Sequence, residues 1–358
     1  MTRDYSQFLK PAKKGATAKR KLSTLEMLGW QPYFAQQISI DDMTETPPVR
    51  VVEVHRNGLH AVGDGVDTII PPGPDATVGD WLLLDPSHPP SSRVLERKSL
   101  IKRRAAGHDR QTQLIAANID TAFIVSSCNQ DFNVARLERY IALAFEAEVD
   151  PVIVLTKIDL CETPDPYVEA ASAISSEVPV VVLDARGDEP KSRLADWCRP
   201  GQTLAFLGSS GVGKSTLINA LSGTRSIATQ TIREDDAKGR HTTTSRQLHI
   251  LPDGCAVLDT PGMRELQLTD AGAGVADVFS DLHALSEQCR FNDCRHETEP
   301  GCAVRSAIAA GEVDSARLAR WQKLIAEDRH NTASLAERKS KDKALGKTIR
   351  QIKKLKKK

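Results

Sequence analysis

The sequence predicts a multidomain protein with three parts: an N-terminal OB-type β-barrel, a central α/β domain with a phosphate-binding loop, and a C-terminal helical module around a metal site. Three observations predict this fold class. Short β-like runs between Gly and Pro clusters fill residues 49–104, apolar strands alternate with helical stretches from residue 121, and three cysteines and a histidine crowd into residues 289–302. The chain of 358 residues also exceeds the usual size of one compact domain.

Composition places the chain among globular proteins. It is 27% charged and 40% hydrophobic, which excludes a largely disordered chain. No run approaches the roughly 18 apolar residues of a membrane span, and the basic N-terminus lacks the apolar segment of a signal peptide. Seven cysteines, an odd number with clustered spacing, indicate a metal site in a reducing compartment and not a disulfide framework. We therefore expect a cytoplasmic protein.

A net charge of +1 conceals a strong segregation of charge. Residues 338–358 carry +10 and residues 1–21 carry +6, which leaves −15 on the rest of the chain. Two basic tails on an acidic body are typical of a protein that contacts a polyanion at localised sites. Solvated tails that only keep the protein soluble would show the same pattern, so charge alone does not decide between the two.

The N-terminal third predicts a basic extension over residues 1–47, with a short packed helix at Ser23–Ile38, followed by an OB-type barrel over residues 48–105. The barrel prediction rests on the regular spacing of the β-like runs. These runs are Val49–Val54, Leu59–Val62, Thr68–Ile70, Trp81–Leu84 and Arg93–Glu96. Such barrels often bind RNA, but a barrel that serves only as a rigid spacer would have the same pattern.

Residues 106–275 predict one α/β domain. Its apolar runs predict buried strands, and helical stretches such as Arg136–Glu148 separate them, an alternation typical of a largely parallel sheet. The predicted strands are Ala122–Val125, Pro151–Leu155, Val178–Leu183, Thr203–Leu207 and Cys255–Leu258. A helical metal-binding domain over residues 276–335 and a basic tail over residues 336–358 complete the predicted chain.

A phosphate-binding loop follows the strand that ends at Leu207. The segment GSSGVGKS matches G-x-x-x-x-G-K-[ST] at every fixed position, with a strand before it and a helical run after it. Its glycines let backbone N–H groups close around phosphates, and the helix N-terminus adds partial positive charge. We expect Lys214 to reach the β- and γ-phosphates as a catalytic group, and the Ser215 hydroxyl to bind Mg²⁺. The predicted nucleotide-binding residues here are Gly208, Ser209, Ser210, Gly211, Val212, Gly213, Lys214, Ser215 and Thr216.

Two further segments indicate guanine and hydrolysis. The segment DTPG, from Asp259 to Gly262, resembles the D-x-x-G switch of GTPases, where the Asp reaches Mg²⁺ through water and the Gly N–H senses the γ-phosphate. The segment TKID resembles the [NT]-K-x-D guanine clamp, and its residues are Thr156, Lys157, Ile158 and Asp159. The Asp159 carboxylate can accept hydrogen bonds from N1–H and the 2-amino group of guanine, a donor pair that adenine lacks. The three segments together predict GTP as the nucleotide.

The order of these segments is unusual. In ordinary GTPases the phosphate loop comes first, the D-x-x-G switch second and the guanine clamp last. Here the clamp at 156–159 precedes the phosphate loop at 208–215, and the switch at 259–262 comes last. This order predicts a circularly permuted domain, which can close the same sheet because the original termini lay near each other. The switch then leads directly into the Cys/His module, so movement at the γ-phosphate can be transmitted there.

The Cys/His cluster predicts a structural metal site. Three thiolates and one imidazole lie within 14 residues, from Cys289, Cys294, His296 and Cys302. This soft tetrahedral set suits zinc and leaves no open position for a catalytic water. One Zn²⁺ per chain would organise a module too small to have much core of its own. The alternatives are four functionally unrelated polar residues or a redox pair among the same cysteines.

The permuted order, the upstream barrel and the downstream cluster together resemble the circularly permuted GTPases that depend on the small ribosomal subunit, the RsgA/YjeQ type. The resemblance runs from about Val49 to Glu327 and is most specific at residues 239–244 (GRHTTT), 259–262 and 289–302. It implies a GTPase that acts late in maturation of the small ribosomal subunit, binds near its decoding region and is stimulated by it.

The resemblance also assigns residues and reveals departures. It implies that Thr243 lies on the first switch and completes the Mg²⁺ shell. Met263 stands where Ras-like enzymes have a water-orienting Gln, so intrinsic hydrolysis is expected to be slow, and His241 is the candidate catalytic group unless it only packs or contacts RNA. Gly211 replaces the Asn typical of potassium-activated GTPases, which argues against that activation. Residues 184–185 (Asp-Ala) are the candidate base-side loop.

These observations predict a monomeric, Mg²⁺-dependent GTPase that binds GTP and GDP and docks on the small ribosomal subunit and its rRNA, with no membrane partner. It would act as an assembly checkpoint, and hydrolysis would release it. The C-terminal tail would contact rRNA phosphates with little sequence preference. Two rivals stay open: an RNA-binding scaffold in which GTP is structural, and a GTP-dependent metal-delivery protein whose Cys/His cluster holds cargo.

Overall fold

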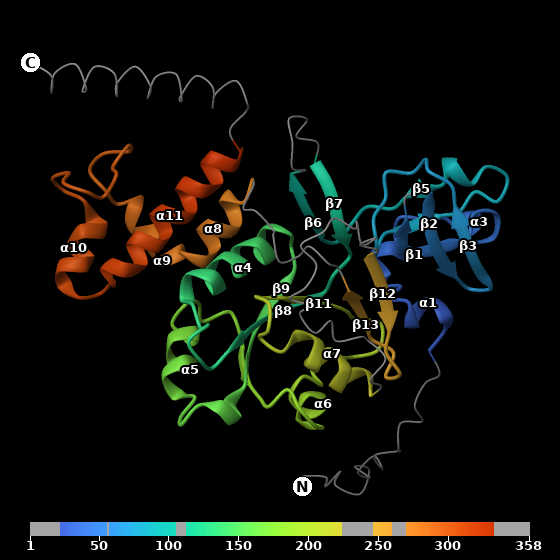
Figure 1. Cartoon of the computed structure of the whole chain (residues 1–358). Helices are drawn as coiled ribbons and strands as arrows, with labels where there is room; N and C mark the ends of the chain where they lie inside the picture. The colour runs from blue at the N-terminus through green and yellow to red at the C-terminus, as the bar shows by residue number, and fades with distance from the viewer. Residues whose placement is uncertain (1–21, 56, 105–111, 224–245, 260–269, 333–358) are drawn as a thin grey trace, which may run out of the picture.

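The computed structural model describes residues 22–55, 57–104, 112–223, 246–259 and 270–332. Figure 1 shows a β-rich part (blue), an α/β part (green to yellow) and a helical part (orange to red), with the first and last of these on opposite sides of the view. The predicted fold class, an N-terminal β region followed by an α/β domain and a Cys/His module, is confirmed. None of the described helices combines the length and the apolar character needed to cross a bilayer.

Two short helices replace the single helix predicted at Ser23–Ile38, and a third follows it. They are α1 (Thr24–Met27), α2 (Pro32–Ala35) and α3 (Ile40–Glu45). The chain turns at Gly29, whose φ of +90° suits glycine, and α2 begins at Pro32, which has no N–H to continue a preceding helix. Trp30 and Phe34 still pack inward, against the ring of Trp81 in the β-rich part.

The β-rich part contains the five predicted strands. They are β1 (Pro48–His55), β2 (Gly58–Gly63), β3 (Val66–Ile70), β4 (Trp81–Leu83) and β5 (Arg93–Val94). They pair antiparallel in the order β3-β2-β1-β4-β5. A hairpin of β6 (Leu100–Arg104) and β7 (Thr112–Ala117) follows and pairs residues on both sides of the boundary predicted at 105. The domain boundaries themselves stay predictions.

The central domain is built on the predicted parallel sheet. Its parallel strands are β8 (Thr121–Ser127), β9 (Asp150–Thr156), β10 (Val180–Val182), β11 (Thr203–Leu207) and β13 (Ala256–Asp259), in the order β10-β9-β8-β11-β13. All residues of β8 and β11 are buried, as expected for strands that are covered on both faces. An additional strand, β12 (Arg246–Ile250), pairs antiparallel with β13. The sequence did not predict it, because only Leu248 among its residues is buried.

Strand β12 joins the α/β domain to the β-rich part. Arg246 and Gln247 pair with Val54 and Glu53 of β1, so one 11-stranded sheet includes strands from both parts. The side chains of Gln247 and Glu53 are hydrogen-bonded across this joint. Strand pairing therefore joins the β-rich part to the central sheet.

Arg50 strengthens the same junction from inside. Its side chain is buried, and burial lowers the pKa of the guanidinium to about 10. The guanidinium donates hydrogen bonds to the carbonyl oxygens of Leu28, Gly79 and Asn118 and to the hydroxyl of Thr203. One cation thus connects the N-terminal helices, the β-rich part and the parallel sheet.

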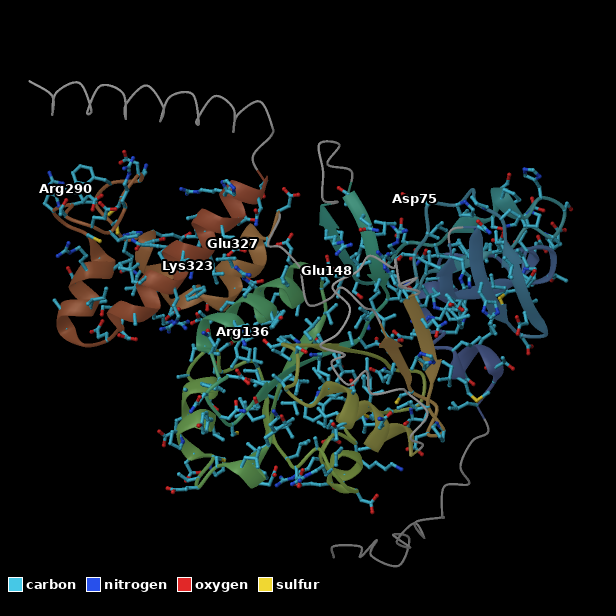
Figure 2. All side chains as sticks on the ribbon, in the orientation of Figure 1. Asp75, Arg136, Glu148, Arg290, Lys323 and Glu327 are labelled. Carbon is cyan, nitrogen blue, oxygen red and sulfur yellow. The ribbon has the colours of Figure 1, made fainter. Side chains whose placement is uncertain are left out.

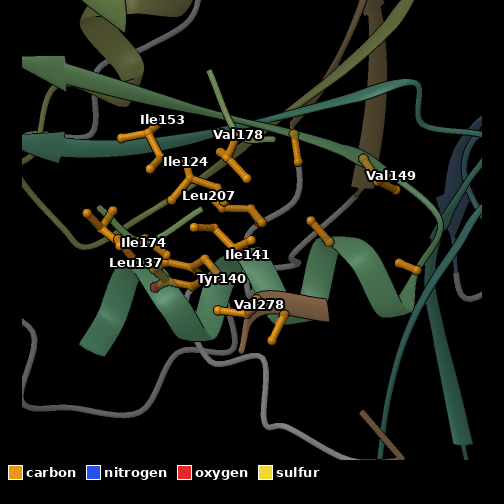
Figure 3. Close-up of a cluster of buried hydrophobic side chains, with 14 of the residues drawn as sticks. Ile124, Leu137, Tyr140, Ile141, Val149, Ile153, Ile174, Val178, Leu207 and Val278 are labelled. Carbon is orange, nitrogen blue, oxygen red and sulfur yellow. The ribbon is translucent and has the colours of Figure 1, made fainter. Parts of the chain in front are cut away.

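Helices cover both faces of the central sheet. They are α4 (Val134–Glu146), α5 (Asp165–Ser172), α6 (Glu189–Arg193) and α7 (Lys214–Ser222). Adjacent residues of β8 face different cores: Ile124 belongs to the core with α4, and Phe123 to the core with Leu217 of α7. Figure 3 shows the first core, in which Leu137 and Ile141 of α4 pack near Ile124.

The C-terminal part is helical, as predicted. Its helices are α8 (Gly272–Val278), α9 (Ser280–Ser286), α10 (Ala303–Ala310) and α11 (Ser315–Thr332). Helix α8 approaches α4 so closely that a Cβ on Gly274 would lie 2.1 Å from the carbonyl oxygen of Ala142. Val275 and Val278 consequently belong to the same core as α4. The helical part and the α/β domain share one hydrophobic core.

A buried carboxylate lies at this shared boundary. Glu138 of α4 is fully buried, and its two oxygens accept hydrogen bonds from Arg320 of α11 at 3.0 and 2.9 Å. Arg317 of α11 lies 3.7 Å from Glu138 and also pairs with Asp281 of α9. Burial raises the pKa of Glu138, and the hydrogen bonds from Arg320 limit that rise.

Replacement Glu138→Ala is expected to loosen α11 from α4. It leaves Arg320 and Arg317 without their buried partner, a change that costs about 3 kcal/mol in free energy of unfolding, and hydrogen exchange of the α11 amides would measure it. Glu327→Ala is the matched control, since Glu327 pairs with Arg139 of the same two helices in a more exposed setting, where a pair contributes less than about 1 kcal/mol. Equal exchange rates in the two variants would contradict the expectation.

Candidate nucleotide site and Cys/His centre

The predicted nucleotide-binding segments meet at one edge of the parallel sheet. The phosphate loop follows β11, the guanine-clamp segment follows β9, and residues 184–186 follow β10. Parallel strands end at the same edge, so their loops gather there, which is where open α/β sheets bind nucleotides. Segments that are far apart in the sequence are therefore neighbours.

The phosphate loop has a backbone that needs its glycines. Gly208, Gly211 and Gly213 have φ values of +140°, +78° and +102°, which L side chains rarely adopt. Lys214 follows as the first residue of α7, and its Nζ folds back to donate to the carbonyl oxygens of Gly208 (2.8 Å) and Ser209. An ammonium and a helix N-terminus at one loop supply the positive charge that phosphate binding requires.

The guanine-clamp segment is fastened to the phosphate loop. Thr156 is fully buried, and its hydroxyl lies 2.6 Å from the carbonyl oxygen of Val212, to which it donates. Gly213 also lies close to this hydroxyl: a Cβ at Gly213 would be 3.4 Å from Thr156 Oγ1. Lys157 adopts the left-handed conformation (φ +58°) and leads into a 3₁₀ turn that holds Asp159.

Arg186 connects the loop of residues 184–186 to the guanine-clamp segment. Its Nη2 lies 2.7 Å from Asp159 Oδ2 and 3.1 Å from Asp184 Oδ2. Hydrogen bonds from Arg186 lower the pKa of Asp184 below its usual value. The Asp184-Ala185 loop therefore lies beside the predicted guanine-binding carboxylate, which supports its expected base-side role. Arg186 was not among the predicted site residues, although its position directly after that dipeptide was a signal.

The four predicted metal ligands form a compact group. Their donor atoms, from Cys289, Cys294, His296 and Cys302, all lie within 4.8 Å of one another. Cys289 Sγ is 3.9 Å from Cys302 Sγ, and His296 Nδ1 is 3.6 Å and 3.4 Å from these two sulfurs. Around tetrahedral zinc, Zn–S distances are near 2.3 Å and Zn–N distances near 2.0–2.1 Å. Two sulfur ligands then lie about 3.8 Å apart, and a nitrogen ligand lies about 3.6 Å from a sulfur ligand. The three distances among Cys289, His296 and Cys302 fit these values, and Cys294 lies close enough to supply the fourth ligand.

Neighbouring elements hold these ligands in place. The ring of His296 stacks on Trp321 of α11, with centroids 5.7 Å apart, and burial lowers the pKa of this imidazole. Cys302 is the N-cap of α10, and its sulfur accepts a hydrogen bond from the Arg305 N–H. The centre is thus built into the helical part.

Comparison with known proteins identifies the family. The family model described as RsgA GTPase matches residues 94–269. A Vibrio parahaemolyticus protein named small ribosomal subunit biogenesis GTPase RsgA 2 is 48% identical over 334 residues, which cover 92% of each chain. The chain belongs to the RsgA GTPase family. A Mesorhizobium japonicum protein named small ribosomal subunit biogenesis GTPase RsgA is also 48% identical, over 86% of this chain and 91% of its own.

Solved structures agree with the RsgA assignment. YjeQ from Thermotoga maritima matches with a TM-score of 0.58 and 26% identity, over 78% of this chain and 97% of its own. YloQ, described as a circularly permuted GTPase, has the same fold, with a TM-score of 0.54 and 24% identity over 81% of this chain and 97% of its own. The resemblance inferred from the motifs is therefore confirmed, and this RsgA-family chain is a GTPase.

Some predicted site residues of this RsgA-family chain lie outside the described part. His241, Thr243 and Gly262 are among them, as is Met263. Asp259 ends β13, where it pairs with Gln247 of β12, so the DTPG segment begins at the same sheet edge as the phosphate loop. The roles expected of these residues stay predictions.

The first glycine of the phosphate loop offers a sharp test of this RsgA site. A Cβ at Gly208 would lie 2.3 Å from the carbonyl oxygen of Val125, which is backbone and cannot swing away. We expect Gly208→Ala to abolish nucleotide binding at concentrations where the wild-type protein is saturated, as measured by calorimetric titration with GDP. Gly211→Ala is the control: its φ is also positive, but a Cβ there meets nothing within 4 Å, so only strain of about 1–2 kcal/mol is added. Similar binding by both variants would contradict the close-approach argument.

Proposed function

We propose that this RsgA-family GTPase binds the small ribosomal subunit late in the maturation of that subunit, that the subunit stimulates its GTP hydrolysis, and that hydrolysis drives release. The observation that carries the proposal is the convergence of the permuted phosphate and guanine-clamp loops in a chain 48% identical to proteins named small ribosomal subunit biogenesis GTPases. Binding in one nucleotide state and release in the other would make the protein an assembly checkpoint.

The proposed nucleotide site uses the loops at the sheet edge. Residues 208–216 bind the phosphates, Asp159 and Lys157 bind guanine, and the 184–186 loop closes the base side. Ser215 at the start of α7 and Thr243 would hold Mg²⁺, which neutralises phosphate charge when bound. Catalysis by His241 remains part of the proposal, because Met263 cannot orient the attacking water.

Zinc is the proposed occupant of the Cys/His centre. Three sulfurs and one imidazole at tetrahedral spacing suit zinc better than the oxygen-seeking cations. The structural role is favoured over metal delivery because Cys302 caps α10 and His296 packs on Trp321. A cargo site would need ligands that can let the metal go without disturbing the surrounding helices.

The β-rich part, the metal module and the two basic tails are the proposed ribosome-facing surfaces. The tails carry +10 and +6 in a chain whose net charge is +1, which suits contacts with rRNA phosphates. We place the protein in the cytoplasm, where ribosomal subunits mature, and expect it to act as a monomer.

The deciding experiment is GTP turnover at physiological salt, measured alone, with purified small subunits and with purified large subunits. Lys214→Ala serves as the blank for contaminating activity. Strong acceleration by the small subunit alone is expected. Slow turnover that no subunit changes, together with intact RNA binding, would overturn the proposal in favour of a scaffold with structural GTP.

A further inference from the structure

The first turn of α4 lies beside the phosphate loop. Strands β8 and β11 are parallel neighbours, and Leu207, the last residue of β11, pairs with Ile124 of β8. The chain after β8 enters α4 and the chain after β11 enters the phosphate loop, so both connections leave the same edge side by side. Any side chain on the first turn of α4 that points along this edge can reach the loop.

Arg136 is such a side chain. Its backbone N–H donates to the side chain of Asn133, the N-cap of α4, which places Arg136 in the first turn. Its Nη1 donates to Ser209 Oγ at 2.6 Å and contacts the carbonyl oxygen of Asp131 at 3.4 Å. A guanidinium from outside all the nucleotide-binding motifs therefore touches the second residue of the phosphate loop.

Ser209 is held from two directions. Lys214 Nζ donates to its carbonyl oxygen, and Arg136 donates to its hydroxyl. The lysine of this motif reaches the β- and γ-phosphates, so Ser209 lies at the end of the loop that faces the terminal phosphates. Arg136 consequently adds a second positive charge at that end.

The position of α4 is fixed from its other side as well. Glu138, two residues after Arg136, pairs with Arg320 of α11. Figure 2 shows Arg136 and Glu148 toward opposite ends of α4, with Glu327 across from the helix. The backbone of Arg136 is thus braced by the helical part, and little reorganisation is needed for its contact with the phosphate loop.

We propose that Arg136 is a positioning residue of the GTPase site, which holds the phosphate loop through Ser209 and favours nucleoside triphosphate over diphosphate. The triphosphate carries more negative charge than the diphosphate, and the extra phosphate lies at the Lys214 end of the loop. A planar guanidinium suits phosphate recognition, and its charge acts even without direct contact. This inference rests on the phosphate-binding role proposed for residues 208–216.

The test is a binding comparison on the full-length protein with a non-hydrolysable GTP analogue and with GDP. Arg136→Ala is expected to weaken binding of the analogue about fivefold and of GDP less than twofold, in line with the loss of one charge-assisted hydrogen bond. Arg136→Lys should restore part of the preference, because it keeps the charge. The analogue defect should shrink as salt rises, because screening weakens what the charge contributes.

Two further variants identify the contact. In a double-mutant cycle, Ser209→Ala should cost less in Arg136→Ala than in the wild-type protein, because the hydrogen bond is already gone. Arg139→Ala is the matched control, since it removes a neighbouring arginine of α4 that pairs with Glu327 instead, and it should leave both affinities unchanged.

The outcomes separate the inference from the site itself. Wild-type affinities in Arg136→Ala, or equal losses for the analogue and GDP, would overturn the role of Arg136. If Lys214→Ala loses both nucleotides while Arg136→Ala is unaffected, the proposed site stands and only the inference fails. If Lys214→Ala binds both nucleotides normally, the phosphate-loop assignment is itself wrong.

Discussion

Replacing Lys214 with alanine is expected to lower subunit-stimulated GTP turnover by at least about 100-fold. Removal of one preorganised group that stabilises developing charge typically costs that much in rate, and this lysine is the side chain of the loop that reaches the β- and γ-phosphates. Turnover measured with small subunits at saturating GTP would show the loss. The variant should fold, because alanine is well tolerated at the start of a helix and the variant keeps the glycines whose positive φ angles shape the loop.

The matched control for this prediction is Lys191→Ala. Lys191 lies on α6 of the same domain, so its removal changes the net charge equally without touching the phosphate loop. We expect wild-type turnover from this variant. Normal hydrolysis by Lys214→Ala would mean that residues 208–215 do not hold the phosphates.

Removing the metal ligand Cys302 is expected to unfold the surroundings of the Cys/His centre. Structural zinc sites in small modules supply on the order of 10–16 kcal/mol of apparent binding free energy, and the loop between Cys289 and Cys302 has few other buried side chains. Cys302→Ser should lose the metal and expose α10 to proteolysis. Metal content by mass spectrometry and limited proteolysis would measure these effects.

Cys198→Ser is the control for this second prediction. Cys198 packs against the core that contains Phe123 and Leu217, whereas Cys302 belongs to the core with α4. Replacement of Cys198 should therefore leave metal content and α10 intact. The Cys302→Ser variant should still bind GDP, because the nucleotide loops belong to the sheet edge. A metal-free protein with an unchanged proteolysis pattern would contradict the structural role and revive metal delivery.

Much of the site could be predicted from the sequence because its chemistry is local. Residues 208–215 lie in one turn between a strand and a helix, and the four metal ligands lie within residues 289–302. The five strands of the β-rich part and the parallel strands of the central domain also left clear apolar runs. In each case the residues that act together are close in the chain, so spacing alone reveals them.

Other features were invisible because they join distant parts of the chain. The pairing of β12 with β1 extends the sheet between domains, yet β12 has one buried residue and β1 gives no sign of its partner. Gly29 and Pro32 are visible in the sequence as residues that interrupt helices, but the spacing of apolar residues across Ser23–Ile38 favoured one helix. Packing of Trp30 and Phe34 against Trp81 is compatible with two short helices as well.

By itself, the sequence determined the class of this protein: a permuted order of guanine and phosphate motifs, followed by a tetrahedral ligand set. Only the tertiary structure decided which charges surround them. Arg136 reaches Ser209 across 73 residues, and Arg320 reaches Glu138 across 182. The sequence around an arginine does not reveal its partner. An arginine that only faces solvent and one that bridges two elements can have the same neighbouring residues. The sheet edge and the shared core bring these groups together, and burial then decides how strongly each pair holds.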